Sequence, residues 1–125
     1  MKPILWSLLL GALSAPLLAG TWSGDLVDSG CFRNEETNVS PDYLNDPGAR
    51  DFAFELRACL PRAGKTKKFD LILADGESLK LDAAGNAKAA ALVRATPKPK
   101  RYFVVRIAGE VRKDTIQVVS IAAAK

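Results

Sequence analysis

The sequence predicts a mainly β protein: a small five-stranded Greek-key barrel of the OB type with one or two short helices, preceded by a signal peptide. Three observations support this prediction. Strand-like segments are separated by turn residues, a helical pattern falls between the third and the fourth of them, and the chain without its leader is long enough to bury one core. A partly open sandwich is the alternative arrangement of the same elements.

Residues 1–19 have the composition of a secretory signal peptide: Lys2 gives a short positive end, and the apolar run from Ile4 to Leu18 leads to small residues. This run is shorter than the roughly 20 residues that a membrane-spanning helix needs. We therefore expect residues 20–125 to form one domain without a membrane span, exported to the periplasm or the extracellular space. An uncleaved anchor is the alternative. A lipid anchor is not expected, because Thr21 stands where a lipoprotein carries its Cys.

The first strand is expected over Thr21–Val27, where Trp22, Gly24 and Leu26 alternate with polar side chains. Gly24 marks a bend or a close approach of two backbones. We expect Trp22 to belong to the core rather than to stack on a sugar. Asp28 follows the strand, and its carboxylate is expected to accept hydrogen bonds from nearby amides in a turn.

A loop and then a helix are expected after this strand. Residues 32–40 are polar and aperiodic, which favours a loop, and Asp46-Pro47 is typical of a helix start. The helix is expected over residues 49–60 and stops before Pro61. One face of it carries apolar residues, namely Phe52, Leu56, Cys59 and Leu60.

Cys31 and Cys59 are the two cysteines of the chain. In an oxidising compartment such a pair predicts a disulfide, which would stabilise the fold by roughly 3–4 kcal/mol through loop closure. Free thiols and intermolecular pairing are the alternatives. Zinc is a poor alternative, because two thiols without any His leave a tetrahedral site incomplete.

A β-hairpin is expected next, with strands over residues 69–73 and 78–81 joined by a turn at residues 74–77. Its inward side chains are Phe69, Leu71, Leu73, Leu79 and Leu81. The alanine-rich segment from Ala83 to Ala95 predicts a short helix with Leu92 as its main apolar anchor.

The last third of the chain gives the strongest strand signal, over residues 101–111 and 115–121, with a turn at residues 112–114. Neither strand alternates strictly, because Val104-Val105 and Val118-Val119 each place two apolar residues in a row. Burial on two faces or a β-bulge, as a small barrel requires, would account for both.

The charge is unevenly distributed in a chain whose formal net charge is +4. Acidic residues dominate residues 20–60 and basic residues dominate from Pro61 onward. This asymmetry suggests either pairing between the two halves or a basic face for an anionic partner, although solvated charges are the simpler explanation. The candidate ligand-binding residues are Lys98, Lys100 and Arg101, whereas Lys65, Lys67 and Lys68 are interpreted as a solvated connector.

The segment at residues 22–31 resembles the opening of a family of small exported bacterial proteins of unknown function. The opening of that family follows the pattern Trp-x-Gly-x-hydrophobic-x-Asp-x-x-Cys, which this chain matches with Trp22, Gly24, Asp28 and Cys31. Later pieces also match in order, namely Cys59, residues 68–76, residues 107–111 and residues 115–118. The insertion at residues 34–51, the loop at residues 96–101 and the absence of His depart from the family pattern. The resemblance implies an OB-like exported domain and supplies no established activity.

Catalytic chemistry is not expected. Without His the usual neutral general base is missing, and no nucleophile motif, phosphate loop or calcium-loop spacing is present. Asp25 and Asp28 start on opposite faces of the strand, so they are not expected to act as an acid–base pair. We expect no enzyme activity, no cofactor and no metal.

The sequence therefore favours an exported binding domain that holds an anionic envelope ligand through a barrel face and the basic loop, which is the loop that carries Lys98, Lys100 and Arg101. The alternative is a structural or inhibitory protein–protein interaction module of the cell envelope. Nucleic acid is not an expected partner, because the chain is exported and, of the adjacent aromatics Tyr102 and Phe103, at most one can face outward. The sequence predicts neither the ligand nor the oligomeric state.

Overall fold

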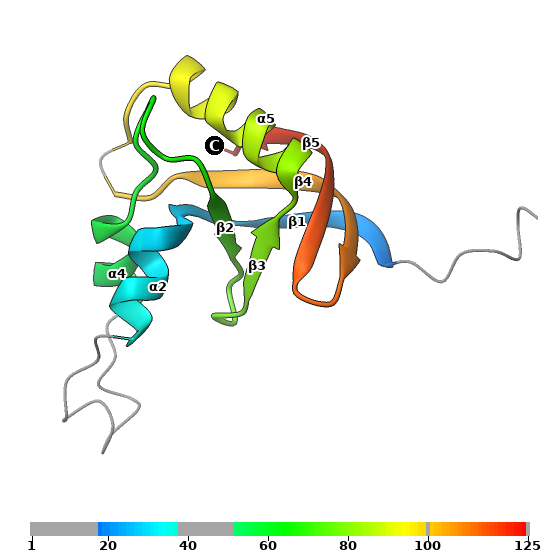
Figure 1. Ribbon diagram of the computed structural model, residues 1–125, viewed down its shortest axis with the longest axis horizontal. Helices are drawn as coiled ribbons and strands as arrows, with labels where there is room; N and C mark the ends of the chain where they lie inside the picture. The colour runs from blue at the N-terminus through cyan, green and yellow to red at the C-terminus, as the bar shows by residue number, and fades with distance from the viewer. Residues whose placement is uncertain (1–17, 38–51, 100, 125) are drawn as a thin grey trace, which may run out of the picture.

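The computed structural model describes residues 18–37, 52–99 and 101–124, and their strands form a closed barrel (Figure 1). The strands are β1 (Leu18–Asp28), β2 (Phe69–Ile72), β3 (Ser78–Leu81), β4 (Val104–Arg112) and β5 (Thr115–Ala123). They follow each other around the barrel in the order β1-β2-β3-β5-β4. The pairing of β3 with β5 is parallel and the other pairings are antiparallel. The predicted five-stranded OB-type barrel is therefore confirmed, and the open sandwich is not formed.

β1 closes the barrel by pairing with two neighbours. Its first part pairs with β4 from Leu18 to Asp25, and its last part pairs with β2 from Asp25 to Asp28. Gly24 lies at the change of partner, where an added Cβ would stand 2.5 Å from the Ile72 carbonyl oxygen. The close backbone approach expected at Gly24 is confirmed. The strand starts earlier than expected, because Leu18 and Ala19 already pair with β4.

The hairpin of β4 and β5 contains the expected irregularity. Ala108 pairs with Ser120 and Gly109 with Val118, so Val119 is an extra residue on β5. Val119 is 71% exposed, whereas Val118 is buried. This β-bulge explains why Val118-Val119 breaks the alternation. At the other pair of valines the expectation is wrong: Val104 is exposed and Val105 is buried, so β4 alternates there without a bulge or burial on two faces.

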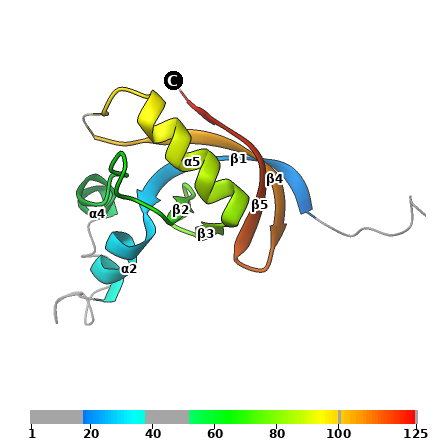
Figure 2. The same ribbon diagram turned by 45° about the horizontal axis from the view of Figure 1, so that its top comes forward.

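α5 (Ala83–Ala95) packs on the barrel beside β5, as both views show (Figures 1 and 2). Its buried residues are Gly85, Ala89 and Val93, which share one face at four-residue spacing. Gly85 allows a close approach, because an added Cβ would collide with the Val118 side chain. The prediction of Leu92 as main anchor is wrong: Leu92 lies beside this face and is only partly buried.

The main core fills the barrel. Its buried members are Leu26, Phe69, Leu71, Leu79, Leu81, Ala89, Val93, Phe103, Val105, Ile107, Ile116 and Val118. Trp22 is partly buried and packs against this core, as expected. Of the hairpin residues expected to face inward, Leu73 is only partly buried, since β2 ends at Ile72.

A second, smaller cluster lies outside the barrel wall, under α2 (Ser29–Thr37) and α4 (Phe52–Ala58). We call it the side cluster; its buried members are Val27, Phe32, Cys59 and Ile72. α2 and α4 lie side by side next to β2 and away from the turn between β4 and β5 (Figures 1 and 2). Because they cover its outer face, β2 is buried on both sides.

The described residues thus contain three helices rather than one or two. The loop prediction for residues 32–40 is wrong up to Thr37, because α2 forms there. α4 confirms a helix before Cys59, whereas the expected helix start at Asp46-Pro47 lies outside the described residues, as do residues 1–17 of the expected leader. None of the helices within the described ranges is both long and apolar enough to cross a membrane.

Candidate binding site

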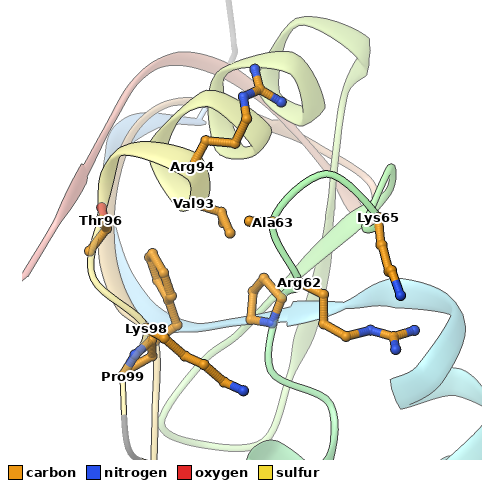
Figure 3. A pocket seen from close by; sticks show the side chains of 10 residues that line it. Arg62, Ala63, Lys65, Val93, Arg94, Thr96, Lys98 and Pro99 are labelled. Atoms are coloured by element: carbon orange, nitrogen blue, oxygen red, sulfur yellow. The ribbon is translucent and has the colours of Figure 1, made fainter.

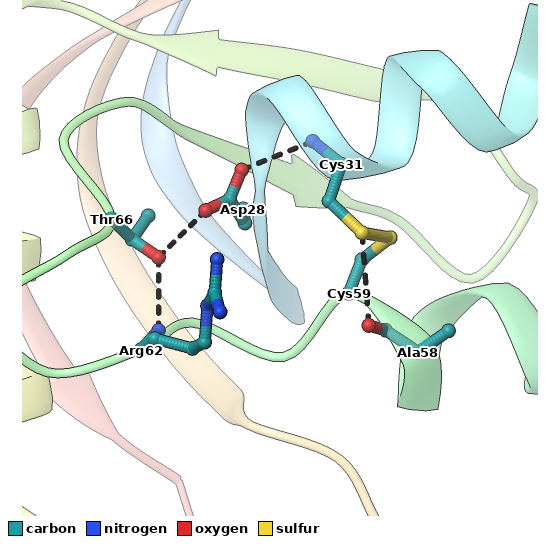
Figure 4. The surroundings of a disulfide bond; sticks show 6 residues. All are labelled: Asp28, Cys31, Ala58, Cys59, Arg62 and Thr66. Atoms are coloured by element: carbon teal, nitrogen blue, oxygen red, sulfur yellow. Dashed lines mark hydrogen bonds between the residues drawn. A yellow bond between two sulfur atoms is a disulfide. The ribbon is translucent and has the colours of Figure 1, made fainter.

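The disulfide between Cys31 and Cys59 joins the start of α2 to the residue that follows α4 (Figure 4). Its formation confirms the predicted pairing. Backbone bonds reinforce the junction: the Asp28 N–H donates to the Cys59 carbonyl at 2.9 Å, and the Ser29 N–H donates to the Lys68 carbonyl at 2.9 Å. The connector after α4 is therefore held against the end of β1.

Asp28 links three segments through one carboxylate (Figure 4). Its Oδ1 accepts from the Cys31 N–H at 3.0 Å, so it caps the first turn of α2. Its Oδ2 accepts from the Thr66 hydroxyl at 2.8 Å. The same hydroxyl accepts from the Arg62 N–H at 2.9 Å. The predicted bonding of Asp28 to nearby amides is confirmed, but it serves a helix start that the sequence did not reveal.

A groove of about 380 Å³ opens beside this junction (Figure 3). Three segments form it: the turn at residues 61–65, the last turns of α5 and the loop at residues 96–99. We call it the basic groove; it is lined by Pro61, Arg62, Ala63, Lys65, Val93, Arg94, Thr96, Lys98, Pro99 and Phe103.

Local hydrogen bonds hold the walls of the basic groove in place. In the first wall, the N–H groups of Lys65 and Thr66 both donate to the Arg62 carbonyl at 3.0 Å. In the second wall, the Thr96 hydroxyl donates to the Leu92 carbonyl at 2.7 Å and ends α5. These bonds hold the turn at residues 61–65 and the end of α5 in place before any ligand binds, which lowers the entropy lost on binding.

The basic groove combines positive charge with an apolar lining. Its cations are Arg62, Lys65, Arg94 and Lys98, and no acidic residue is among the lining residues. Val93 and Phe103 are buried in its floor. Such a surface can pair with anionic groups and at the same time cover an apolar face of a ligand.

Only one of the three predicted ligand-binding residues is found to line the basic groove. Lys98 lines the basic groove, Arg101 is exposed but is not among its lining residues, and Lys100 lies outside the described residues. Arg62 and Arg94 were missed by sequence reasoning. Lys65, interpreted as part of a solvated connector, lines the groove as well.

The adjacent aromatic residues Tyr102 and Phe103 do not both face outward, as expected. Phe103 is buried in the core, and Tyr102 is half-buried, with its hydroxyl accepting from Arg57 Nη1 at 3.3 Å.

The carboxylates of Asp25 and Asp28 have different surroundings. Asp25 lines a hollow beside α4 with Leu56 and Ile72, and partial burial there raises the pKa of its carboxyl. Asp28 is bonded to Cys31 and Thr66, as described above. Within residues 18–37, 52–99 and 101–124, no three His, Cys, Asp or Glu side chains are grouped so that they could hold a metal ion.

Comparison with known proteins identifies no relative: no protein family, no curated protein and no solved structure matches the chain at a significant level.

Proposed function

We propose that this protein is an exported binding domain that holds an anionic component of the cell envelope in the basic groove. One observation supports this above the others: four cations from two separate stretches of the chain, residues 62–65 and 94–98, line one groove without an acidic residue among the lining residues. Arg62 comes from the turn at residues 61–65 and Lys98 from the loop at residues 96–99, so two different walls of the groove each supply a cation (Figure 3). The proposal keeps Lys98 from the sequence prediction and adds Arg62, Lys65 and Arg94.

The ligand that suits this groove is an anion with an apolar face. The guanidinium groups of Arg62 and Arg94 can each make paired hydrogen bonds to a carboxylate or a phosphate. The apolar floor can cover a sugar ring or the start of an acyl chain. An acidic glycan and an anionic lipid headgroup share this chemistry.

The proposed export rests on the leader-like residues 1–19 and on the disulfide. A disulfide between Cys31 and Cys59 suits an oxidising compartment, because cytosolic thiols are kept reduced. Residues 20–125 would be the mature domain, in keeping with the resemblance to small exported proteins. We propose binding rather than catalysis because His is absent from the chain and Asp28 is already engaged in two hydrogen bonds.

Binding of residues 20–125 to polygalacturonate and to phosphatidylglycerol vesicles, at low and high salt, tests the proposal. We expect one of the two to bind, and binding to weaken as salt screens the charges. Arg94→Ala should lower the affinity about tenfold through the loss of a charge-assisted contact. Lys88→Ala is the matched control, because Lys88 is exposed on the same helix and does not line the groove.

Equal losses for Arg94→Ala and Lys88→Ala would contradict a defined groove and indicate attraction by net charge alone. A protein partner whose capture survives high salt and ignores both substitutions would instead favour the interaction-module alternative.

A further inference from the structure

A second hollow, of about 420 Å³, lies on the outer face of the hairpin of β2 and β3. It shares no lining residue with the basic groove. We call it the outer hollow and define it by Arg33, Lys68, Asp70 and Lys80, with Gly30 at the start of α2. Asp70 stands in the middle of this sheet surface, because it pairs with Val27 of β1 on one side and with Lys80 of β3 on the other.

Asp70 is a buried carboxylate with only one of its oxygens engaged. Its side chain is 1% exposed. Oδ2 contacts Arg33 Nη2 at 3.5 Å and accepts from the Ser78 hydroxyl at 3.2 Å. Oδ1 is buried and has no hydrogen-bond partner among the described residues. A buried oxygen in this state is costly, so it favours a ligand that brings a hydrogen-bond donor.

The surroundings of Asp70 are basic. Arg33, Lys68 and Lys80 line the same hollow, against the single carboxylate of Asp70. Lys80 is also 3.5 Å from Asp114, and both of those side chains are largely exposed, so this pair is screened by solvent. Arg33 and Lys68 therefore outnumber the single carboxylate of Asp70 in the outer hollow, and this excess of positive charge suits an acid group placed next to the donor.

We propose that the outer hollow binds a small molecule in which a hydroxyl or an ammonium group stands next to a carboxylate. The donor bonds Asp70 Oδ1, and the carboxylate faces Lys68 and Arg33. Hydroxy acids, including acidic sugars, and amino acids share this arrangement. The proposal does not depend on the basic groove, because the two sites have no lining residue in common.

Amide chemical-shift titrations of residues 20–125 with lactate, alanine and propionate test this proposal. The three acids have the same carbon skeleton and differ in carrying a hydroxyl, an ammonium group or neither. We expect saturable shifts at Gly30, Lys68 and Lys80, with lactate or alanine binding about tenfold more tightly than propionate. The lactate and alanine arms distinguish a hydroxy acid from an amino acid.

Asp70→Asn should abolish the preference over propionate, and Arg94→Ala should leave it unchanged, which separates this site from the basic groove. If Asp70→Asn does not fold, Lys68→Gln on the exposed rim serves instead and should weaken binding of all three acids. Equal binding of propionate, shifts confined to the groove residues Lys65 and Lys98, or no shift at any concentration would each overturn the proposal.

Discussion

The barrel core and the side cluster are held together in different ways. The barrel core has a dozen buried residues, which lie on the five strands of a closed sheet, on α5 and, for Phe103, just before β4. The side cluster has four buried residues under two short helices, and one of them is a disulfide cysteine. The barrel is stabilised mainly by burial of apolar surface, whereas the small cluster also needs a covalent link and a capping carboxylate. The basic groove is lined by Val93 and Phe103 of the barrel core and by the connector that follows Cys59 of the side cluster.

The largest effect is expected from Ile107→Ala in the barrel core. Ile107 is fully buried and belongs to β4, which pairs with both β1 and β5. Truncation leaves a cavity and should lower the free energy of unfolding by about 4 kcal/mol. Denaturant unfolding followed by circular dichroism measures this. Hydrogen exchange should accelerate throughout the barrel, and acceleration restricted to β4 would contradict a single cooperative core.

Removal of the disulfide by Cys31→Ser with Cys59→Ser should lower the free energy of unfolding by about 3 kcal/mol. In addition, the two helices that the disulfide joins should open locally more readily than the barrel. Exchange should accelerate at amides of α2 and α4 before those of β4 and β5. Affinity for anions should also fall, because Arg62 follows Cys59 by three residues and loses its fixed position. Unchanged exchange in both helices would show that the side cluster is stable without the covalent link.

Asp28→Ala should lower the free energy of unfolding by about 1–2 kcal/mol, since it removes the cap of α2 and the bond to Thr66. Thermal unfolding measures the loss. Thr66→Val keeps the cap but removes both bonds of the Thr66 hydroxyl, the one to Asp28 and the one from the Arg62 N–H. We expect it to cost less than Asp28→Ala, and a loss at least as large as that of Asp28→Ala would show that the cap contributes no more than the Arg62 bond.

Asp25→Asn should produce the smallest change, a slight stabilisation at neutral pH. Burial raises the pKa of Asp25 from its usual 3.8, so the folded state holds this proton more tightly than the unfolded state. That contribution favours folding below about pH 3.8 and is lost as the pH rises through the raised pKa. The advantage of Asp25→Asn over the natural protein should therefore grow across this range and stay constant above it. Thermal unfolding between pH 3 and 8 measures this, and an advantage that shrinks with rising pH would contradict it.

Sequence patterns were most informative where the spacing of apolar residues along the chain matches the side chains that the fold buries. Alternation placed Leu71 and Leu79 in the core, and consecutive valines at Val118-Val119 indicated the bulge. α2 was missed because most of its residues are polar and only Phe32 among the described ones is deeply buried. Asp28 was correctly expected to bind amides, but the helix that it caps has no clear apolar period.

The basic groove could not be predicted in full for a different reason. Arg62, Arg94 and Lys98 come from two stretches of chain about thirty residues apart, and each is an ordinary exposed cation in sequence. Only the docking of α5 on the barrel and the anchoring of the connector by Cys59 bring them together. The burial of Asp70 could not be predicted either, because a single acidic residue in an alternating strand is normally exposed to solvent.

The amino-acid sequence by itself determined the five strands, the helix between the third and the fourth, and the pairing of the two cysteines, because alternation and cysteine count depend on near neighbours and composition. The tertiary structure alone decided which charges share a surface and which carboxylate is buried, because charge placement depends on contacts between distant segments. The proposed binding sites belong to this second class.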